Sequence, residues 1–179
     1  MVISEIQTDG YGVSGKWESH EKNLYASFTT NIVDNLSIRA SLISYYYIKE
    51  YIKNIILKIP NDIYYKKDKL SGVIVEDNII GIGINFNGND NIGINNITKE
   101  HNPIDIDLFV KTIKKVMKIP KEEIQKTYQE IALKDIDNFN IYIKNDMKKI
   151  DIKITEINDN KLITKDKTYH IEQLKFLIK

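Results

Sequence analysis

The sequence contains no cysteine, which excludes disulfide bonds and also metal centres or nucleophiles that depend on a thiolate. No apolar run is long enough to span a bilayer, and residues 1–5 lack the basic start and apolar core of a signal peptide. The net charge is only +1, so no strong overall field attracts nucleic acid or a membrane. A reducing cytoplasm is the expected location.

Arginine and histidine are scarce. Arg39 is the single arginine and all other basic residues are lysines, a bias typical of an AT-rich genome, so the lysine-rich stretches are interpreted mainly as solvated faces. His20, His101 and His170 lie far apart along the chain and show no metal-ligand spacing. The sequence therefore predicts no metal site formed by protein side chains.

Apolar residues are plentiful, since 42% of the 179 residues are hydrophobic, enough for one cored domain with or without a small appendage. Their spacing predicts strands, amphipathic helices and a hairpin at Asp77-Asn78. The expected strands cover residues 2–7, 23–30, 57–59, 70–76 and 78–86, the expected helices cover residues 37–56 and 105–117 and begin again at Pro120, and a polar loop covers residues 88–103.

These elements favour an α+β fold with a mixed central sheet and flanking helices. A parallel α/β sheet with helices on both faces is the main competitor. After about residue 140 the pattern changes to short strands, expected over residues 141–143, 150–157, 161–164 and 168–171. We therefore expect a main domain over residues 1–135 and a small C-terminal β module over residues 136–179.

A turn with the sequence Lys-Ile-Pro-Asn-Asp over residues 58–62 precedes an apolar strand that begins at Lys69. Pro60 fixes its own φ and restricts the residue before it, so Asn61 and Asp62 leave the strand at a set angle. Cations on a rigid scaffold beside a carboxylate suit chemistry at a phosphate or an acyl phosphate.

Three stretches, in this order and spacing, resemble the motifs of the biotin–protein ligase family. Residues 7–17 and 23–27 read Gln-Thr-Asp-Gly-Tyr-Gly-Val-Ser-Gly-Lys-Trp and Asn-Leu-Tyr-Ala-Ser, where the family has a Gln-Thr-Ala-Gly-Arg-Gly-Arg-type loop closing on Trp and then Asn-Leu-Tyr-x-Ser. The turn at 58–62 and residues 69–76 match Lys-Trp-Pro-Asn-Asp and Lys-Leu-x-Gly-Ile-Leu-Val-Glu, and residues 81–85 match Gly-Ile-Gly-Ile-Asn. The resemblance runs from about residue 3 to residue 89 and is specific in combination.

This resemblance implies a catalytic ligase domain over residues 1–135, related in fold to class II aminoacyl-tRNA synthetases, and a small terminal β-barrel. It also implies two chemical steps. The biotin carboxylate attacks the α-phosphate of ATP, which is accompanied by Mg²⁺, to give biotinyl-5′-adenylate and pyrophosphate. The amine of a lysine on the biotin carboxyl carrier domain of acetyl-CoA carboxylase, or of a similar carboxylase, then displaces AMP.

The resemblance also assigns roles to particular residues. Lys69 is expected beside the reacting carboxylate and the α-phosphate, and Lys58 beside the phosphates or the incoming acceptor. Asp62 is expected to orient the acceptor lysine and help to remove its proton. The residues expected to bind biotin and the adenylate are Gln7, Gly10, Tyr11, Gly12, Val13, Lys69 and Gly72, and those expected to bind ATP are Trp17, Asn61 and Asn85.

The sequence departs from the family pattern in three places. The family's loop arginines fall on Tyr11 and Val13, so the adenylate is expected to be held less firmly. The tryptophan of the turn is replaced by Ile59. The usual preceding strand, helix and biotin-lining segment have no counterpart before Met1, so we expect a truncated start, and no DNA-binding helix-turn-helix precedes the ligase motifs.

Two alternatives remain open at the level of the sequence. One is a lipoate or octanoyl transferase with the same fold. The other is a non-catalytic module that binds biotin or a carrier domain. The arginine-poor loop and the truncated start favour it, whereas the intact motif residues argue against it, namely Lys58, Asn61, Asp62, Lys69 and Asn85. No nucleic-acid or membrane partner is expected, and a homodimer formed through a sheet edge is possible.

Overall fold

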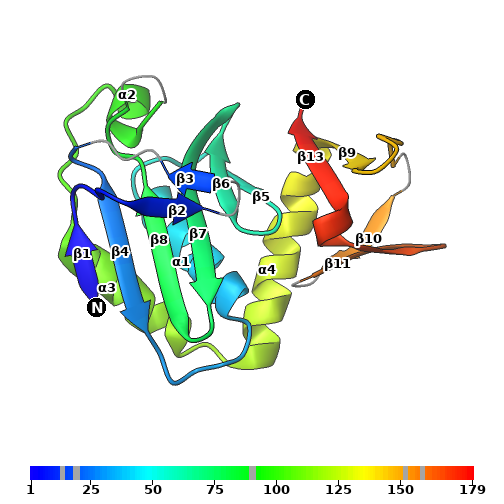
Figure 1. Cartoon of the computed structure of the whole chain (residues 1–179), viewed down its shortest axis with the longest axis horizontal. Helices are drawn as coiled ribbons and strands as arrows, with labels where there is room; N and C mark the ends of the chain where they lie inside the picture. Colours follow the sequence, from blue (N-terminus) through cyan, green and yellow to red (C-terminus); the bar gives the residue numbers. More distant parts are fainter. Residues whose placement is uncertain (13–14, 18–20, 89–91, 151–152, 158–159) are drawn as a thin grey trace.

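The computed structural model describes residues 1–12, 15–17, 21–88, 92–150, 153–157 and 160–179. Its centre is a six-stranded sheet in the order β1-β4-β8-β7-β6-β5 (Figure 1). The strands of this main sheet are β1 (Val2–Ser4), β4 (Leu24–Thr29), β5 (Ile56–Lys58), β6 (Asp62–Tyr65), β7 (Asp68–Glu76) and β8 (Ile79–Ile84).

The α+β class with helices flanking a central sheet is confirmed. Every neighbouring pair in the main sheet is antiparallel, so the expectation of a mixed sheet was wrong in that detail. The reason is local: β5, β6, β7 and β8 follow one another through short turns, and short turns can join only antiparallel strands. The predicted hairpin at Asp77-Asn78 is confirmed, with Glu76 paired to Ile79.

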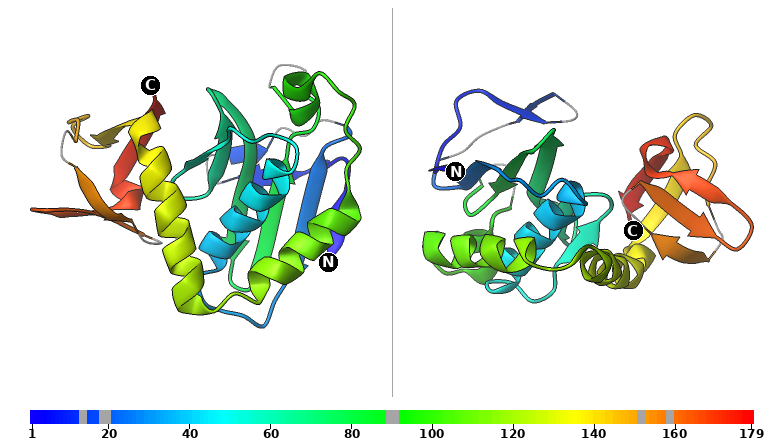
Figure 2. Two further views of the ribbon diagram at one scale, coloured as in Figure 1. Left: turned by 180° about the vertical axis from the view of Figure 1, so that it is seen from behind. Right: turned by 90° about the horizontal axis from the view of Figure 1, so that it is seen from below.

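The helices lie together on one face of the main sheet (Figure 2). Most of α1 (Leu36–Lys49) is buried, because it packs against β7 and β8 on one side and against α3 (Ile106–Met117) on the other. The predicted start of α3 is confirmed, since the Asp105 carboxylate accepts a hydrogen bond from the Leu108 amide at 2.8 Å. The predicted start of α4 (Lys121–Asp135) after Pro120 is also confirmed.

Three local expectations were wrong. Helix α1 ends at Lys49, because residues 50–55 turn the chain into β5 while Ile52 and Ile55 still pack into the core. Strand β6 follows the turn directly, at residues 62–65, where no strand was expected. A short helix, α2 (Ile94–Thr98), lies inside the predicted loop, where Gly93 sits so close to the Phe86 carbonyl that a Cβ would be 2.5 Å from its oxygen.

A small hairpin of β2 (Gly10–Gly12) and β3 (Gly15–Trp17) lies across the sheet on the side away from the helices (Figures 1 and 2). Its two strands are antiparallel, with Gly10 opposite Trp17 and Tyr11 opposite Lys16. The main sheet therefore has one face covered by helices and one face overlaid by this hairpin.

A second group of strands follows α4. After a 3-10 turn (Ile136–Asn138), these strands are β9 (Phe139–Ile143), β10 (Ile154–Ile157), β11 (Lys161–Thr164), β12 (Thr168–His170) and β13 (Leu174–Ile178). They form two small sheets, β10-β11-β12 and β13-β9. The predicted β module is thus present, with the addition of β13, while the domain boundary at residues 135/136 stays a prediction.

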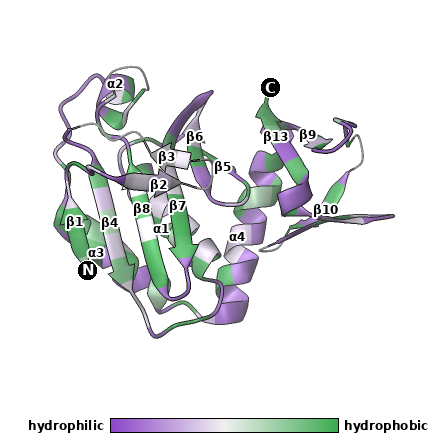
Figure 3. Cartoon of the chain, viewed as in Figure 1, coloured by the Kyte–Doolittle hydropathy of each residue, from purple (hydrophilic) through white to green (hydrophobic). Residues whose placement is uncertain are grey.

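Hydrophobic residues are concentrated in the main sheet, whereas the tips of the hairpins and the outside of α4 are hydrophilic (Figure 3). Buried apolar residues of the C-terminal module, including Phe139 and Leu162, continue the core of the main domain. In the described part of the chain, no helix has both the length and the apolar character needed to cross a membrane.

The only arginine holds the helical layer together. Arg39, on α1, is 2% exposed, and its guanidinium donates to the carbonyls of Val116 (3.0 Å) and Ile119 (2.9 Å) at the end of α3. It also donates to the Asp34 carbonyl at 3.1 Å and pairs with the Asp34 carboxylate at 3.0 Å, which lowers the pKa of that carboxyl. One planar group therefore caps α3 and anchors the start of α1.

Arg39→Lys is predicted to destabilise the protein by about 2–3 kcal/mol, because one ammonium cannot reproduce these divergent hydrogen bonds in a buried position. Urea denaturation followed by circular dichroism would measure the loss. Lys114→Arg on the exposed side of α3 is the matched control and should stay within about 0.5 kcal/mol of the parent. Equal stability of the two variants would contradict the anchoring role of Arg39.

Candidate functional site

The strand register aligns one residue from each strand of the main sheet in a single row. Directly opposed residues of antiparallel strands carry their side chains on the same face. We call this line the glycine row, and its members from β5 to β1 are Lys58, Asp62, Gly72, Gly83, Tyr25 and Ser4.

The glycine row faces away from the helices. Its neighbours along the strands, such as Leu57, Ile63 and Ile82, alternate to the other face and are buried in the core. At the centre of the row, Gly72 and Gly83 contribute no side chain, and we call this stretch between Asp62 and Tyr25 the floor. The hairpin overlies this face, and Gly72 is buried while Gly83 is partly buried. Glycine at both positions is typical of a place where another group packs close to the backbone of a sheet.

Lys69 and Asp62 form an ion pair beside this floor. The Lys69 Nζ lies 2.7 Å from Asp62 Oδ1, and their side chains are 35% and 22% exposed. The β6–β7 register shifts between Ile63 and Tyr64, and this irregularity places Lys69 opposite Tyr64, two residues along β6 from Asp62, so the two charges meet. The structure thus unites the predicted cation and the predicted carboxylate at one place.

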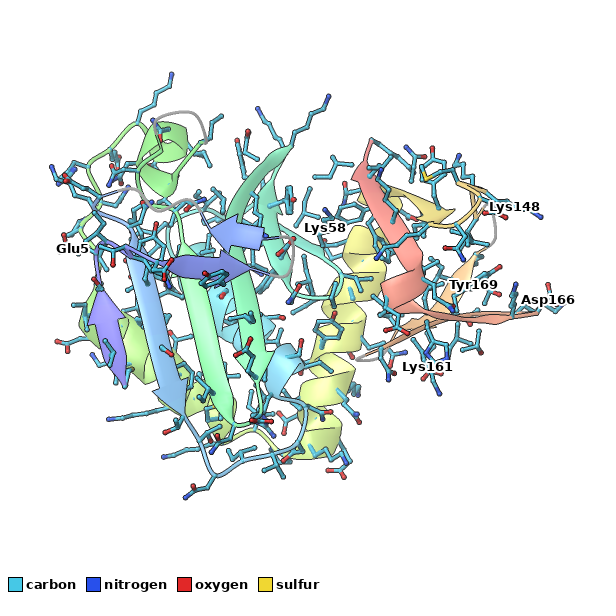
Figure 4. All side chains as sticks on the ribbon, in the orientation of Figure 1. Glu5, Lys58, Lys148, Lys161, Asp166 and Tyr169 are labelled. Carbon is cyan, nitrogen blue, oxygen red and sulfur yellow. The ribbon has the colours of Figure 1, made fainter. Side chains whose placement is uncertain are left out.

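Lys58 lies in the same row but its ammonium is directed elsewhere. Its Nζ is 4.9 Å from the centre of the Tyr64 ring and 3.3 Å from the Tyr64 hydroxyl oxygen. Burial raises the pKa of Tyr64, and the Asp62 charge raises it further. Lys58 is on the side of the main sheet that faces the C-terminal module (Figure 4), so its predicted contact with phosphates or the acceptor stays a prediction.

Asn61 and Asn85 use their amides to hold the backbone around Lys69. The Asn61 Nδ2 donates to the Val73 carbonyl at 2.8 Å, and the Asn85 Nδ2 donates to the Lys69 carbonyl at 3.1 Å. The backbone amide of Asn85 also donates to the Leu70 carbonyl at 2.8 Å. Both residues therefore position β7 in this structure, and their predicted contacts with ATP remain predictions.

The glycine-rich segment supplies the hairpin above the sheet. Gln7 is exposed and packs so closely on Gly10 that a Cβ there would lie 2.6 Å from Gln7 Oε1. Tyr11 is 70% exposed on β2. Gly12 ends β2 and the backbone of Trp17 ends β3, whereas Val13 lies outside the residues that the structure describes.

Three functional candidates were missed at the level of the sequence. Tyr25 and Gly83 belong to quoted motifs, but only the register shows that they share a row with Asp62. Asn23 is fully buried, and its Oδ1 accepts from the amides of Phe86 and Asn87 at 2.8 Å each. The available signal was the asparagine that precedes Leu-Tyr in the second motif.

Two further observations concern metal-ligand clusters and cavities. Within the described ranges, no group of three or more His, Cys, Asp or Glu side chains gathers in a way that could hold a metal ion. A cavity of about 660 Å³ lies away from the glycine row, between the end of α4 and the C-terminal module, and its lining includes Leu133, Phe139 and Lys153.

The model of the Biotin/lipoate A/B protein ligase family matches residues 1–95, more than half of the chain, so the chain belongs to this family. The matched residues include the β2–β3 hairpin, the turn before β6, and the strands β7 and β8. Comparison with curated protein sequences finds no match.

Solved structures of biotin protein ligases share the fold. The Aquifex aeolicus enzyme in complex with biotin and ATP is 23% identical, with a TM-score of 0.71 over 99% of this chain and 88% of that one. The Helicobacter pylori biotin acetyl coenzyme A carboxylase synthetase is 20% identical, with a TM-score of 0.65 over 94% and 84%. The Leishmania major ligase in complex with biotin is 18% identical, with a TM-score of 0.59 over 99% and 87%.

The edge strand beside the site is tied to α4 by a buried carboxylate. Asp135 accepts the Leu57 amide at 2.8 Å, and burial raises the pKa of Asp135 despite this hydrogen bond. The native state therefore keeps the proton to a higher pH than the unfolded chain does. The free energy of unfolding should fall as the pH rises from about 4 through the raised native pKa.

Asp135→Asn keeps an acceptor oxygen for Leu57 and removes this titration. We predict that the stability of the parent relative to the variant declines as the pH rises across that window. Urea denaturation at a series of pH values would measure the difference. Asp137→Asn, which removes an exposed carboxylate from the same segment, is the control. If the difference in stability between the parent and Asp135→Asn stayed constant with pH, the prediction would be contradicted.

Proposed function

We propose that this chain attaches biotin to a lysine of a biotin carboxyl carrier protein, with ATP as the second substrate and biotinyl-5′-adenylate as the intermediate. The observation that carries the proposal is the Lys69–Asp62 ion pair at the edge of the floor formed by Gly72 and Gly83. Membership of the ligase family and the biotin-ligase fold support it.

In the first step, two anions must meet. The biotin carboxylate oxygen forms a bond to the α-phosphorus, and the bond from that phosphorus to the pyrophosphate oxygen breaks. Lys69 would leave Asp62, or share its ammonium protons between Asp62 and the incoming oxygens of the carboxylate and the α-phosphate. It would thereby lower the repulsion between these two anions. Mg²⁺ would arrive with the triphosphate and neutralise its charge.

In the second step, a neutral amine is required from a group that is normally protonated at neutral pH. Asp62 would accept a proton from the acceptor ammonium, and the freed amine nitrogen would attack the acyl carbon. An amide bond forms, the nitrogen releases its second proton to solvent, the bond from the acyl carbon to the phosphate oxygen breaks, and AMP leaves. The 2.7 Å pair holds Asp62 beside Lys69 before the substrates bind, and Asp62 would become available for this role once Lys69 is drawn to the phosphate.

The neutral ring end of biotin would lie on the floor of the glycine row under the hairpin. Gln7 would offer amide hydrogen bonds to the uncharged ureido group, and the backbone at Gly72 and Gly83 would permit close approach. Tyr25, which is 6% exposed, forms the wall at the other end of the floor. The family also contains lipoate ligases, so the assay should include lipoate and octanoate in parallel with biotin.

Lys69→Ala is predicted to reduce biotin-dependent pyrophosphate release from ATP by about a hundredfold or more, because a charge-stabilising donor is removed from the reacting centre. Lys67→Ala, at an exposed lysine in the turn between β6 and β7, is the control and should retain activity. Circular dichroism would verify that both variants are folded. Near-parental adenylation by Lys69→Ala would refute the assignment, and activity with lipoate alone would redirect it to the lipoate branch.

Gly83→Val tests the floor itself. Valine suits an extended strand, but its side chain would occupy the space between Tyr25 and Gly72. Overpacking costs about 1–3 kcal/mol, so biotin should bind roughly ten- to a hundredfold more weakly while the fold persists. Isothermal titration calorimetry would measure this, with Ser27→Val on the same face of β4 as the control. Unchanged affinity in Gly83→Val would place biotin elsewhere.

A further inference from the structure

We propose that Tyr128 on α4 is a positioning residue for the Asp62–Lys69 pair and that it acts through the backbone carbonyl of Pro60. The inference rests on the proposed function, because that pair is the reacting centre. Nothing in the motifs around residues 58–62 points to α4, which lies more than sixty residues further along the chain.

A short hydrogen bond joins α4 to the turn before β6. The Tyr128 hydroxyl donates to the Pro60 carbonyl oxygen at 2.7 Å, and the residue is 1% exposed. A buried tyrosine hydroxyl needs a partner, and a ring packed on all sides has little freedom to seek another. The Ser41 hydroxyl also lies 3.5 Å from this oxygen, but its shorter bond, at 2.7 Å, goes to the Ser37 carbonyl.

The hydrogen bond to Pro60 also fixes the residues that follow it in the turn. The Pro60 carbonyl and the Asn61 amide belong to one planar peptide group, so fixing the oxygen fixes the direction in which Asn61 leaves the turn. The Asn61 side chain is then tied to the Val73 carbonyl at 2.8 Å. The turn is held from one side by α4 and from the other by β7, and Asp62 is the next residue.

Helix α4 holds this edge of the sheet at two places. Asp135 accepts the Leu57 amide at 2.8 Å, while Tyr128 binds Pro60. Tyr128 and Asp135 are two helical turns apart, about 10 Å along the axis, and lie on the same face of α4. Leu57 lies on β5 and Pro60 in the turn that follows this strand, so α4 contacts both the strand and the turn.

A merely structural role would make Tyr128 equivalent to other buried tyrosines, and the chain contains a suitable comparison. Tyr47 on α1 is fully buried, and its hydroxyl donates to the Asp105 carbonyl at 3.2 Å. Tyr128→Phe and Tyr47→Phe each remove one buried hydroxyl that donates to a backbone carbonyl. The Asp105 carbonyl keeps the Phe109 amide as a donor at 3.0 Å, and Tyr47 also accepts from the Tyr51 hydroxyl at 3.2 Å. Only the Pro60 carbonyl is next to Asn61 and Asp62.

The experiment compares the parent chain, Tyr128→Phe and Tyr47→Phe by two readouts. Biotin-dependent exchange of pyrophosphate into ATP gives kcat and the KM for biotin. Hydrogen exchange of the Asn61 side-chain amide, followed by nitrogen-15 NMR, reports the bond to Val73 without any need for activity. Urea denaturation of each variant measures the accompanying loss of stability.

We expect Tyr128→Phe to lower kcat by about tenfold with KM changed by less than about twofold, because the charges are displaced while the binding floor is kept. The Asn61 amide should exchange faster in this variant alone. Unchanged kcat, unchanged Asn61 exchange, or an equal fall in kcat for Tyr47→Phe would overturn the proposal. If the parent shows no biotin-dependent exchange, the proposed function fails, and Asn61 exchange alone decides whether Tyr128 positions the turn.

Discussion

The site depends on the register of four neighbouring strands in the main sheet. Asp62, Gly72, Gly83 and Tyr25 are directly paired from β6 to β4, so they lie in one line on one face, and the register shift after Ile63 brings Lys69 beside this line. A shift of one residue in any of these strands would turn its member of the line towards the helices. Register is strongly specified here, since the alternate positions carry isoleucines, leucine and valine that must be buried.

The same alternation explains how one sheet serves two purposes. In β8 every second residue is an isoleucine that packs on α1, and the residues between are Gly81 and Gly83. The helical layer keeps the sheet rigid from behind, through Arg39 at the junction of α1 and α3 and through α4 at the edge strand β5. Charges held on a rigid support can be aligned in advance with the charge that develops in a reaction, which is the physical basis of the proposed adenylation.

The sequence predicted the parts of this arrangement that depend on local pattern. Hairpin chemistry at Asp77-Asn78, the start of a helix at residue 105 and the motif residues Lys69 and Asp62 could all be recognised without a structure. What could not be predicted arises from contacts between distant segments. The strand register places Tyr25 and Gly83 in the glycine row, and the packing of α4 places the Tyr128 hydroxyl against the Pro60 carbonyl.

Arg39 shows the same limit most clearly. In the sequence, a single arginine in a lysine-rich chain indicates only a bias in base composition. In the structure, its guanidinium makes hydrogen bonds that lysine cannot match. Helix α1 also ends earlier than its apolar spacing indicates, because Ile52 and Ile55 remain buried without being helical. The spacing of apolar residues reports only which side chains are buried. The backbone conformation of residues 50–55 depends on the connection from α1 to β5.

The central claim is that biotin binds on the floor of the glycine row, and mapping the ligand on the folded chain tests it most directly. Biotin should be titrated into nitrogen-15-labelled protein while the backbone amide resonances are followed. The account predicts that Gly72, Gly83 and Tyr25 shift together and saturably. Shifts confined to the cavity between α4 and the C-terminal module, at Phe139 and Lys153, or no shifts at all, would contradict it.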